Sequence, residues 1–323
     1  MLDESSGEIN PLSFDLDSLP FSTPQHFELH QNHVKFTNDV ECKTVISIND
    51  SSSLMYDFKI LPSGHILAES AYNIKLWTPD GRECLKTYRG HTHRVWNLQI
   101  VDSNRFASSS SDKTIKIWNF STGECMATLE SHTDWINSII IKDNLLISAS
   151  DDATIKVWEL NTYSCLKTIQ AHNHYIQCIK MMDTTTLISG SADRTIKLWN
   201  LMTGECLATL IGHNNWVTCV EVLLTGELIS GSNDLCIKIW DIKSGRCLKT
   251  FDGHKDYVMC LAVTKSNTIV SASKDRTIRI WCPLNGVCLS ILTGHTDYIY
   301  SLYVYDSGEI VSGSPDHTLR VWK

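Results

Sequence analysis

The sequence lacks several features on which common classes of function depend. It has no apolar run long enough to cross a bilayer, and residues 1–10 are acidic and polar where a secretory signal would be apolar. It also has no Gly-x-Gly-x-x-Gly fingerprint, no phosphate-binding P-loop and no Cys-x-x-Cys pair. We therefore expect an intracellular, cytoplasmic protein, with the nucleus left open, that has no membrane span, no cofactor and no metal site.

The sequence also lacks an excess of basic residues. The formal net charge is −8, and residues 1–40 account for −6 of it because they hold seven acidic residues and only Lys35. This leaves residues 41–323 close to neutral. A nucleic-acid-binding domain is expected to concentrate Lys and Arg in a stripe. Direct nucleic-acid binding is therefore not expected.

Tryptophan, in contrast, recurs at a fixed interval. The seven tryptophans of the series are Trp77, Trp118, Trp158, Trp199, Trp240, Trp281 and Trp322, spaced 41, 40, 41, 41, 41 and 41 residues apart. A period of about 40–45 residues is typical of β-propeller blades, which bury their apolar faces by stacking in a closed ring. Each repeat contains alternating segments rich in β-branched residues, such as 187–191 and 195–199, separated by turns. The sequence predicts an all-β, seven-bladed propeller of four-stranded antiparallel blades over residues 41–323.

On these residues the chain resembles the WD-repeat β-propellers. Six histidines, four of them in Gly-His pairs, precede a tryptophan of the series by 26 or 27 residues, and an aspartate stands six residues before each of the same tryptophans. Only Trp240-Asp241 keeps the literal Trp-Asp pair. The match therefore depends on the whole pattern of the repeat.

The resemblance implies a structural hydrogen-bonded tetrad of His, Asp, Ser and Trp in each of six blades. Two positions on one face of a strand are candidates for the serine of the tetrad. In the fourth repeat they are Ser189 and Ser191. In the first repeat, Ala71 stands six residues before the tryptophan and Glu69 replaces one serine, while Asn49 or Asp50 falls where the histidine should be; that blade is expected to lack a tetrad. The implied tetrad residues are His91, Asp112, Trp118, His132, Asp152, Trp158, His172, Asp193, Trp199, His213, Asp234, Trp240, His254, Asp275, Trp281, His295, Asp316 and Trp322.

Acid, imidazole and hydroxyl are also the members of a catalytic triad. Six copies spread around a ring cannot converge on one reaction centre, and blade geometry accounts for them. We therefore expect no enzyme activity and no small-molecule substrate. An enzyme would need a site that these patterns do not describe.

Cysteine is abundant, with 12 residues, seven of which recur once per repeat. The recurring cysteines fall on different blades, too far apart to pair in a closed ring. We expect free, mostly buried thiols, as in a reducing compartment.

The two ends of the chain are predicted to meet. The seventh repeat reaches only its third strand at Trp322, while residues 41–45 repeat the pattern of residues 83–87 and Cys42 extends the cysteine series. We expect this N-terminal strand to close the last blade beside the hairpin of residues 311–322, which covers an otherwise open sheet edge.

Residues 1–40 are expected to form an acidic N-terminal tail separate from the propeller. Residues 11–21 alternate acidic and apolar side chains between prolines. Two interpretations stay open. The tail is a flexible leader or a strip packed on the propeller's side, or it is a short motif that docks on a partner and becomes ordered there.

In similar propellers, partners bind the narrow top face through the residues three and five positions after each tetrad histidine and the residue before each turn aspartate. Seven of the 12 histidine-derived positions are aromatic here, and aromatic side chains dominate protein interfaces. The candidate partner-binding residues are Arg94, Trp96, Trp135, Asp151, Tyr175, Trp216, Asn233, Tyr257, Lys274, Tyr298 and Tyr300.

The predicted function is a noncatalytic scaffold that binds a peptide or loop of another protein on that face. The alternative is the substrate-recognition subunit of a ubiquitin ligase or of another regulatory complex, because the Gly-x-Cys-Leu runs resemble F-box/WD-repeat propellers. Residues 1–40 contain no F-box-like helical segment. Among the top-face positions only Arg94 and Lys274 offer the cations that a receptor for phosphorylated motifs needs.

Overall fold

The alternating segments of each repeat form β-strands in the computed structural model, which describes residues 40–48 and 55–323. In the strand of residues 195–200, for example, Ile196 and Leu198 are buried on one face while Lys197 stays partly exposed on the other. The described residues form strands, turns and bends without any helix, so none of them provides a helix able to span a membrane. The acidic tail, apart from Val40, lies outside the described residues.

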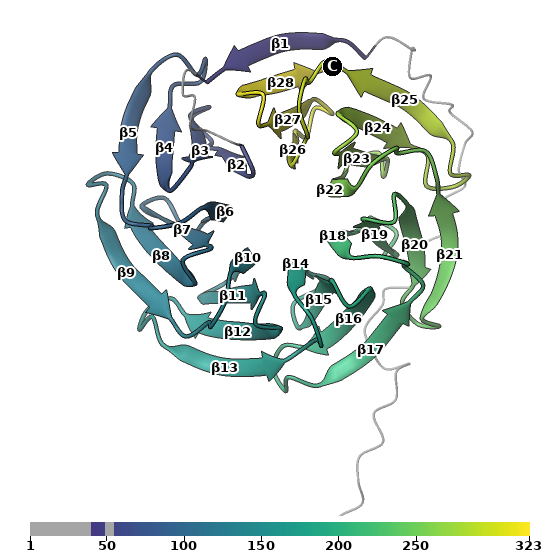
Figure 1. The fold of residues 1–323 in the computed structure, drawn as a ribbon, viewed down its shortest axis with the longest axis horizontal. Helices are drawn as coiled ribbons and strands as arrows, with labels where there is room; N and C mark the ends of the chain where they lie inside the picture. Colours follow the sequence, from purple (N-terminus) through teal and green to yellow (C-terminus); the bar gives the residue numbers. More distant parts are fainter. Residues whose placement is uncertain (1–39, 49–54) are drawn as a thin grey trace, which may run out of the picture. The chain divides into compact units, whose positions relative to one another are not determined.

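Seven four-stranded antiparallel sheets stand around a central channel like the blades of a propeller (Figure 1). The first three blades are β2–β5 (Phe58–Ile60, Ile66–Ser70, Asn73–Trp77, Cys84–Tyr88), β6–β9 (Val95–Ile100, Arg105–Ser110, Thr114–Asn119, Cys125–Glu130) and β10–β13 (Ile136–Lys142, Leu145–Ser150, Thr154–Glu159, Cys165–Gln170). The next three are β14–β17 (Ile176–Met181, Thr186–Ser191, Thr195–Asn200, Cys206–Ile211), β18–β21 (Val217–Val222, Leu228–Ser232, Ile237–Asp241, Arg246–Phe251) and β22–β25 (Val258–Val263, Ile269–Ser273, Thr277–Trp281, Cys288–Thr293). The seventh blade consists of β26 (Ser301–Val304), β27 (Ile310–Ser314), β28 (Thr318–Trp322) and β1 (Cys42–Ser47).

The seventh blade confirms the predicted closure by the N-terminal strand. β1 pairs antiparallel with β28, with Thr44 opposite Val321 and Ser47 opposite Thr318. The two strands lie side by side at the top of the ring in Figure 1. Because β1 supplies the outermost strand, the edge of β28 is covered by backbone hydrogen bonds.

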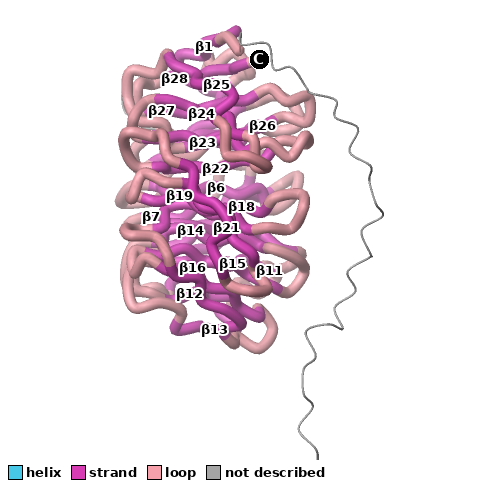
Figure 2. Tube along the Cα trace, turned by 90° about the vertical axis from the view of Figure 1, so that its right-hand side faces the viewer, coloured by secondary structure: helices cyan, strands magenta, loops and turns pink. Residues whose placement is uncertain are grey.

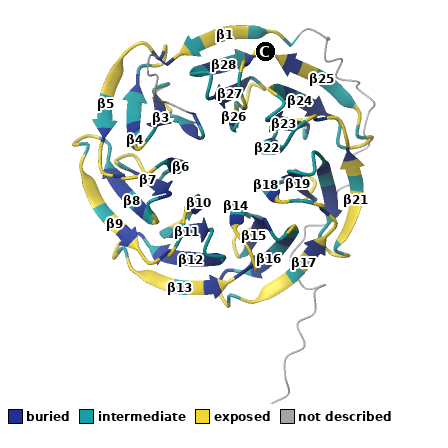
Figure 3. Ribbon diagram, in the orientation of Figure 1, coloured by how far each residue is buried: buried dark blue, intermediate teal, exposed yellow. Residues whose placement is uncertain are grey.

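The hydrophobic core of the described residues is divided into seven clusters, each of which joins two neighbouring blades. One cluster joins Ile147 and Ile155 of the third blade to Ile176 and Trp199 of the fourth. Figure 3 shows the consequence: the second and third strands are largely buried, whereas the outermost strands carry most of the exposed residues. No blade buries its own faces, so each depends on its neighbours for stability.

The expectation of mostly buried thiols was wrong for the recurring cysteines. They stand in the outermost strands, where five of the seven are exposed: Cys84, Cys125, Cys165, Cys206 and Cys247. In β9, β13 and β17 the cysteine and the residue after it begin the strand and are both exposed, and only the fifth residue of each strand is buried. All 12 cysteines of the chain are free.

Turns and loops gather at the two faces of the disc, with the strands between them (Figure 2). One face carries the turns between the second and third strands and the loops that lead into each blade. Hydrogen bonds between the six histidines of those loops and the aspartates of those turns link the two sets. We call this face the top face and the opposite one the bottom face.

Candidate partner-binding face

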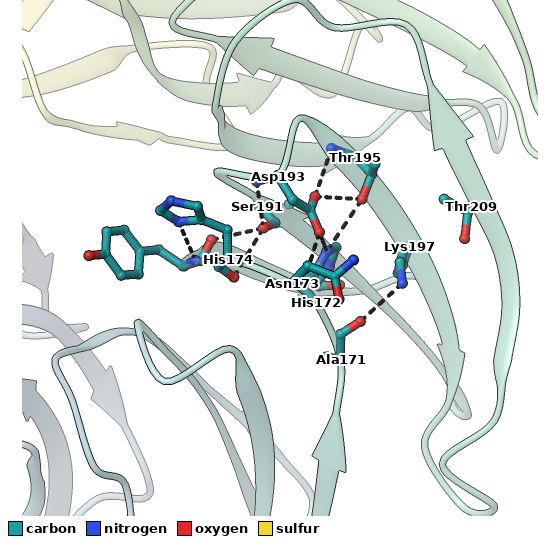
Figure 4. A network of polar contacts seen from close by, with 12 residues as sticks. Ala171, His172, Asn173, His174, Ser191, Asp193, Thr195, Lys197 and Thr209 are labelled. Atoms are coloured by element: carbon teal, nitrogen blue, oxygen red, sulfur yellow. Dashed lines mark hydrogen bonds and ion pairs between the residues drawn. The ribbon is translucent and has the colours of Figure 1, made fainter.

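Six blades contain the same hydrogen-bonded tetrad at the edge of the top face. In the fourth blade, the His172 Nδ1 lies 2.8 Å from the Asp193 carboxylate and the Nε2 lies 2.7 Å from the Ser189 hydroxyl (the His172–Asp193 pair is visible in Figure 4). The Trp199 indole N–H donates to the same hydroxyl across 2.8 Å. Since the hydroxyl accepts from Trp199, it donates to His172, whose Nδ1–H then donates to Asp193.

The structure thereby decides between the two serines that the sequence left open. Ser189, with its equivalents Ser108, Ser148, Ser230, Ser271 and Ser312, belongs to the tetrad. Ser191 instead accepts the Asp193 N–H across 3.0 Å and donates to the Tyr175 carbonyl across 2.9 Å. It shapes the turn next to the tetrad.

Burial sets the electrostatics of the tetrads. Burial opposes ionisation of the aspartates, but the hydrogen bond from the histidine, with further donors, outweighs it and lowers the pKa of Asp234 to about 2. The pKa values of the other five aspartates are lowered for the same reason. Burial also lowers the pKa of His91 and His132, although their aspartates oppose this.

The tetrad has the hydrogen-bond connectivity of a catalytic triad, but its serine is not accessible to a substrate. The Ser189 side chain is fully buried, and its hydroxyl is covered by the Trp199 indole that donates to it. Both ring nitrogens of His172 already have partners within the protein. The tetrads therefore fasten the loop entering a blade to the hairpin of that blade.

The first blade differs from its sequence-based alignment in one respect. Its hairpin is one residue shorter than the others, so Ser70 pairs with Asn73 and Ala68 pairs with Lys75. In the fourth blade Ser189 pairs with Lys197. Ala68 therefore stands at the position of the tetrad serine and Glu69 at that of Gly190, so Glu69 replaces neither of the two serines, and the turn contains no aspartate. Asn49 and Asp50 lie outside the described residues.

Six of the candidate partner-binding residues line the central channel, a cavity of about 730 Å³. They are Trp96, Trp135, Asp151, Tyr175, Trp216 and Tyr300. Trp135 is 46% exposed, and Tyr175 and Trp216 are each 37% exposed. The mouth of the channel on the top face is therefore rich in accessible aromatic surface.

Four other candidates lie outside the channel wall and take part in cation–π contacts. Arg94 and Lys274 are the cations and reach rings of the wall, whereas Tyr257 and Tyr298 are rings that contact Lys274. The Arg94 guanidinium lies 5.5 Å from the Trp96 ring centre. The Lys274 ammonium lies 5.1 Å from the ring of Tyr257, 5.3 Å from that of Tyr298 and 5.9 Å from that of Tyr300. These two cations hold the surrounding rings in place.

Tyr56 belongs to this cluster and was missed by the sequence analysis. Its ring centre lies 4.5 Å from that of Tyr300 in a tilted arrangement and 4.9 Å from that of Trp96 in an edge-to-face arrangement, and the Arg94 guanidinium lies 4.8 Å above it. At the common repeat interval of 41 residues Tyr56 aligns with Asn97. The first hairpin is one residue shorter, which shifts that alignment by one residue and places Tyr56 at the position of Trp96. The length of this hairpin was therefore the sequence signal that could have identified Tyr56.

Asp151 is held in place at the channel mouth. The Asn137 amide donates to its carboxylate across 2.6 Å and to the Ile176 carbonyl of the next blade across 2.9 Å. Burial raises the pKa of Asp151 to about 6, although the Asn137 hydrogen bond opposes the shift. The last candidate, Asn233, donates its backbone N–H to the Trp216 carbonyl across 2.9 Å and does not line the channel.

Below the mouth, polar side chains connect neighbouring blades through the channel wall. Asp57 accepts the Leu98 N–H across 2.8 Å, and Asn97 accepts the Ile139 N–H across 3.1 Å. On the other side of the ring, burial raises the pKa of the Cys178 thiol to about 12 and that of Cys260 to about 11. Such thiols are poor nucleophiles at neutral pH. The described part of the chain contains no cluster of His, Cys, Asp and Glu that would hold a metal ion.

Six segments of the chain match the family model of the WD domain, G-beta repeat: residues 82–119, 123–159, 163–200, 204–241, 245–282 and 286–323. The chain belongs to the WD40 family. Each WD40 segment supplies the outermost strand of one blade and the three inner strands of the next. The first repeat, whose hairpin lacks the aspartate, is not among the matched segments.

Comparison with known proteins adds a solved structure and a relative. The crystal structure of the WD40 β-propeller domain of Doa1 is similar over 88% of this chain and 96% of that chain, with 27% identity and a TM-score of 0.77. A nuclear distribution protein, PAC1, of Fusarium vanettenii is 31% identical over 91 residues, which are 24% of this chain. The match spans 20% of the length of PAC1.

Proposed function

We propose that this WD40 propeller is a noncatalytic scaffold that binds a peptide or loop of a partner protein on its top face. WD40 propellers are in general protein-interaction domains, which supports a scaffold of some kind. The observation that carries the finer proposal is the group of exposed aromatic side chains Trp135, Tyr175 and Trp216 at the channel mouth. Tryptophan and tyrosine bury much area on binding and lose little rotamer freedom.

The structural roles of the polar side chains support a noncatalytic function. The tetrads engage the histidines and serines that resemble a triad, and the channel thiols at Cys178 and Cys260 have raised pKa values. An intracellular, cytoplasmic location, with the nucleus open, belongs to the same proposal. The 12 free cysteines support it because oxidising compartments favour disulfides.

A double substitution tests the top-face proposal. Trp135→Ala combined with Trp216→Ala removes the two exposed indoles of the channel mouth, and partners recovered by affinity purification and mass spectrometry should fall at least about tenfold, as expected when interface hot spots are lost. The circular dichroism spectrum should not change.

The matched control is Met202→Ala combined with Leu284→Ala. These apolar side chains are 68% and 75% exposed, in turns on the bottom face. The control should recover the same partners as the wild type. Recovery of partners at wild-type strength by the tryptophan variant would refute top-face binding.

The second candidate function is recognition of a phosphorylated motif as part of a ubiquitin ligase or another regulatory complex. Its support is that neither Arg94 nor Lys274 has a carboxylate within 4.0 Å among the described residues. A phosphate group is a suitable partner for each of these cations. Phosphorylation of a bound peptide should then tighten binding by about tenfold, the ratio that corresponds to 1.4 kcal/mol. An affinity that does not change on phosphorylation would eliminate this candidate.

A further inference from the structure

The charged side chains that line the channel are balanced, with one exception. The Lys59 ammonium lies 3.0 Å from the Asp57 carboxylate, and the Lys180 ammonium lies 2.6 Å from the Glu221 carboxylate. Asp151 lines the same channel, and no cationic side chain of the described residues approaches its carboxylate within the 4.0 Å of an ion pair. A half-buried carboxylate without a counter-charge favours a cation from outside the chain.

The surroundings of Asp151 fit a cationic side chain. Its backbone N–H donates to the Trp135 carbonyl across 2.8 Å, so Asp151 is a backbone neighbour of the residue with the most exposed indole of the channel mouth. Tyr175 lines the same mouth and is 37% exposed. Aromatic faces next to a carboxylate attract ammonium and guanidinium groups.

The charges next to Asp151 do not remove its preference for a cation. Asp134 and Asp152 add negative potential near Asp151, and His174 opposes it only when its imidazole is protonated. His174 is partly engaged, because its Nδ1 accepts the Tyr175 N–H across 2.9 Å. An anionic group of a partner would be repelled here by the carboxylates of Asp134, Asp151 and Asp152.

We propose that the partner segment inserts a Lys or Arg side chain into the channel mouth, with its cationic group on the Asp151 carboxylate and its stem against Trp135 and Tyr175. This inference rests on the proposed top-face function and names the chemistry that the face selects. The cavity of about 730 Å³ falls within the range of about 300–1,000 Å³ that is usual for ligand pockets.

The test uses a display library of random 12-residue peptides selected on the purified full-length protein at pH 7.5. Selected peptides should share a Lys or Arg at one position. Asp151→Asn should weaken their binding by about tenfold or more, the ratio that corresponds to 1.4 kcal/mol. Replacing the shared basic residue by norleucine should cause the same loss, and the two losses should not add.

Asp143→Asn is the matched control. It makes the same charge change at the other end of β11, on the bottom-face turn, where the Asp143 side chain is 79% exposed. It should leave peptide binding unchanged.

A second readout separates a binding role from a structural one. Because burial raises the pKa of Asp151 to about 6, its ionised form destabilises the free protein, and Asp151→Asn should raise the melting temperature at pH 7.5 by about 2 °C. The gain should shrink as the pH falls and vanish below about pH 3, where Asp151 is protonated in both the folded and the unfolded chain. A purely structural Asp151 would lose stability when substituted.

The outcomes distinguish a failure of the cation site at Asp151 from a failure of the proposed top-face function. Selected peptides without a basic residue, or equal affinity for wild type and Asp151→Asn, overturn the cation site and leave top-face binding intact. Peptides whose binding survives Trp135→Ala with Trp216→Ala overturn the top-face function. A library that yields no binding peptide overturns both.

Discussion

In six blades a single buried hydroxyl satisfies two side chains at once. Ser189 accepts from the Trp199 indole and donates to His172, with 2.8 and 2.7 Å between the bonded atoms. Ser191, two residues along the same strand, bonds only to backbone groups of the adjoining turn and loop. The two serines look alike in the sequence, yet their removal should have different consequences.

We predict that Ser189→Ala lowers the free energy of unfolding by about 2–3 kcal/mol, because it leaves both the indole N–H and the imidazole nitrogen buried without a partner. Ser191→Ala should lower it by about 1 kcal/mol. Ser244→Ala, at an exposed turn, serves as the control and should have little effect. Urea unfolding followed by tryptophan fluorescence measures all three. Equal losses for Ser189→Ala and Ser191→Ala would contradict the tetrad assignment.

Individual residues of the channel mouth show which parts of the site could be predicted from the sequence. The interval of about 41 residues located Trp96 and Tyr300, because a tetrad histidine fixes the alignment of their repeats. Tyr56 was missed because its repeat has no such histidine and its hairpin is one residue shorter. The missing counter-charge of Asp151 depends on which side chains meet across blades, and periodicity contains no such information.

At the scale of strands, the closure of the ring depends on one short strand. β1 covers β28 through five paired positions from Thr318 to Trp322, and Ile46 packs against the core between the seventh and first blades. Without β1 the edge of β28 would present unpaired backbone groups.

We predict that a chain starting at residue 49 is destabilised and self-associates, whereas a chain starting at residue 39, which keeps β1, behaves like the full-length protein. Thermal unfolding and size-exclusion chromatography with light scattering measure the two properties. A monomeric product with an unchanged melting temperature after removal of β1 would contradict the closure.

The exposure of the recurring cysteines shows where strand prediction from sequence ends. The repeat correctly indicated a strand at Cys165 and its equivalents, and its recurrence made a common structural role reasonable. Burial, however, depends on what packs against each position of a strand, and the sequence pattern of one repeat does not contain this information. Cys165 and its neighbour Leu166, at the beginning of β13, are both exposed, whereas Ile169 of the same strand is buried.

At the scale of the whole molecule, repetition made the fold predictable and the partner unpredictable. Every blade repeats the residues that stack it on its neighbours, so the period alone indicates the number of blades and the ring. Residues that line the channel differ from blade to blade: five positions after the tetrad histidine, the second blade has Trp96 and the fifth blade has Thr218. The binding specificity therefore lies in the positions that the repeat leaves free.

The six buried tetrads should also make the stability of the whole ring depend on pH. The aspartates have pKa values below their ordinary 3.8 in the folded state, so their stabilisation is present above that pH and is lost as the pH falls toward about 2. His91 and His132 have pKa values below 6.5, so the unfolded chain takes up protons first and stability begins to fall below about pH 6.5. Asp151, with a pKa raised to about 6, opposes this fall between pH 6 and 4.

We therefore predict urea midpoints that are nearly constant from pH 8 to 7, decline below about pH 6.5 and drop steeply below pH 4. The decline should persist in 1 M NaCl, because salt screens exposed charges far more than the buried His–Asp pairs. Asp151→Asn provides the internal control, since it removes the opposing group and should make the decline between pH 6 and 4 steeper. Midpoints that stay constant from pH 8 to 3 would show that the tetrads do not make stability depend on pH, and a decline abolished by salt would assign the acid sensitivity to surface charges.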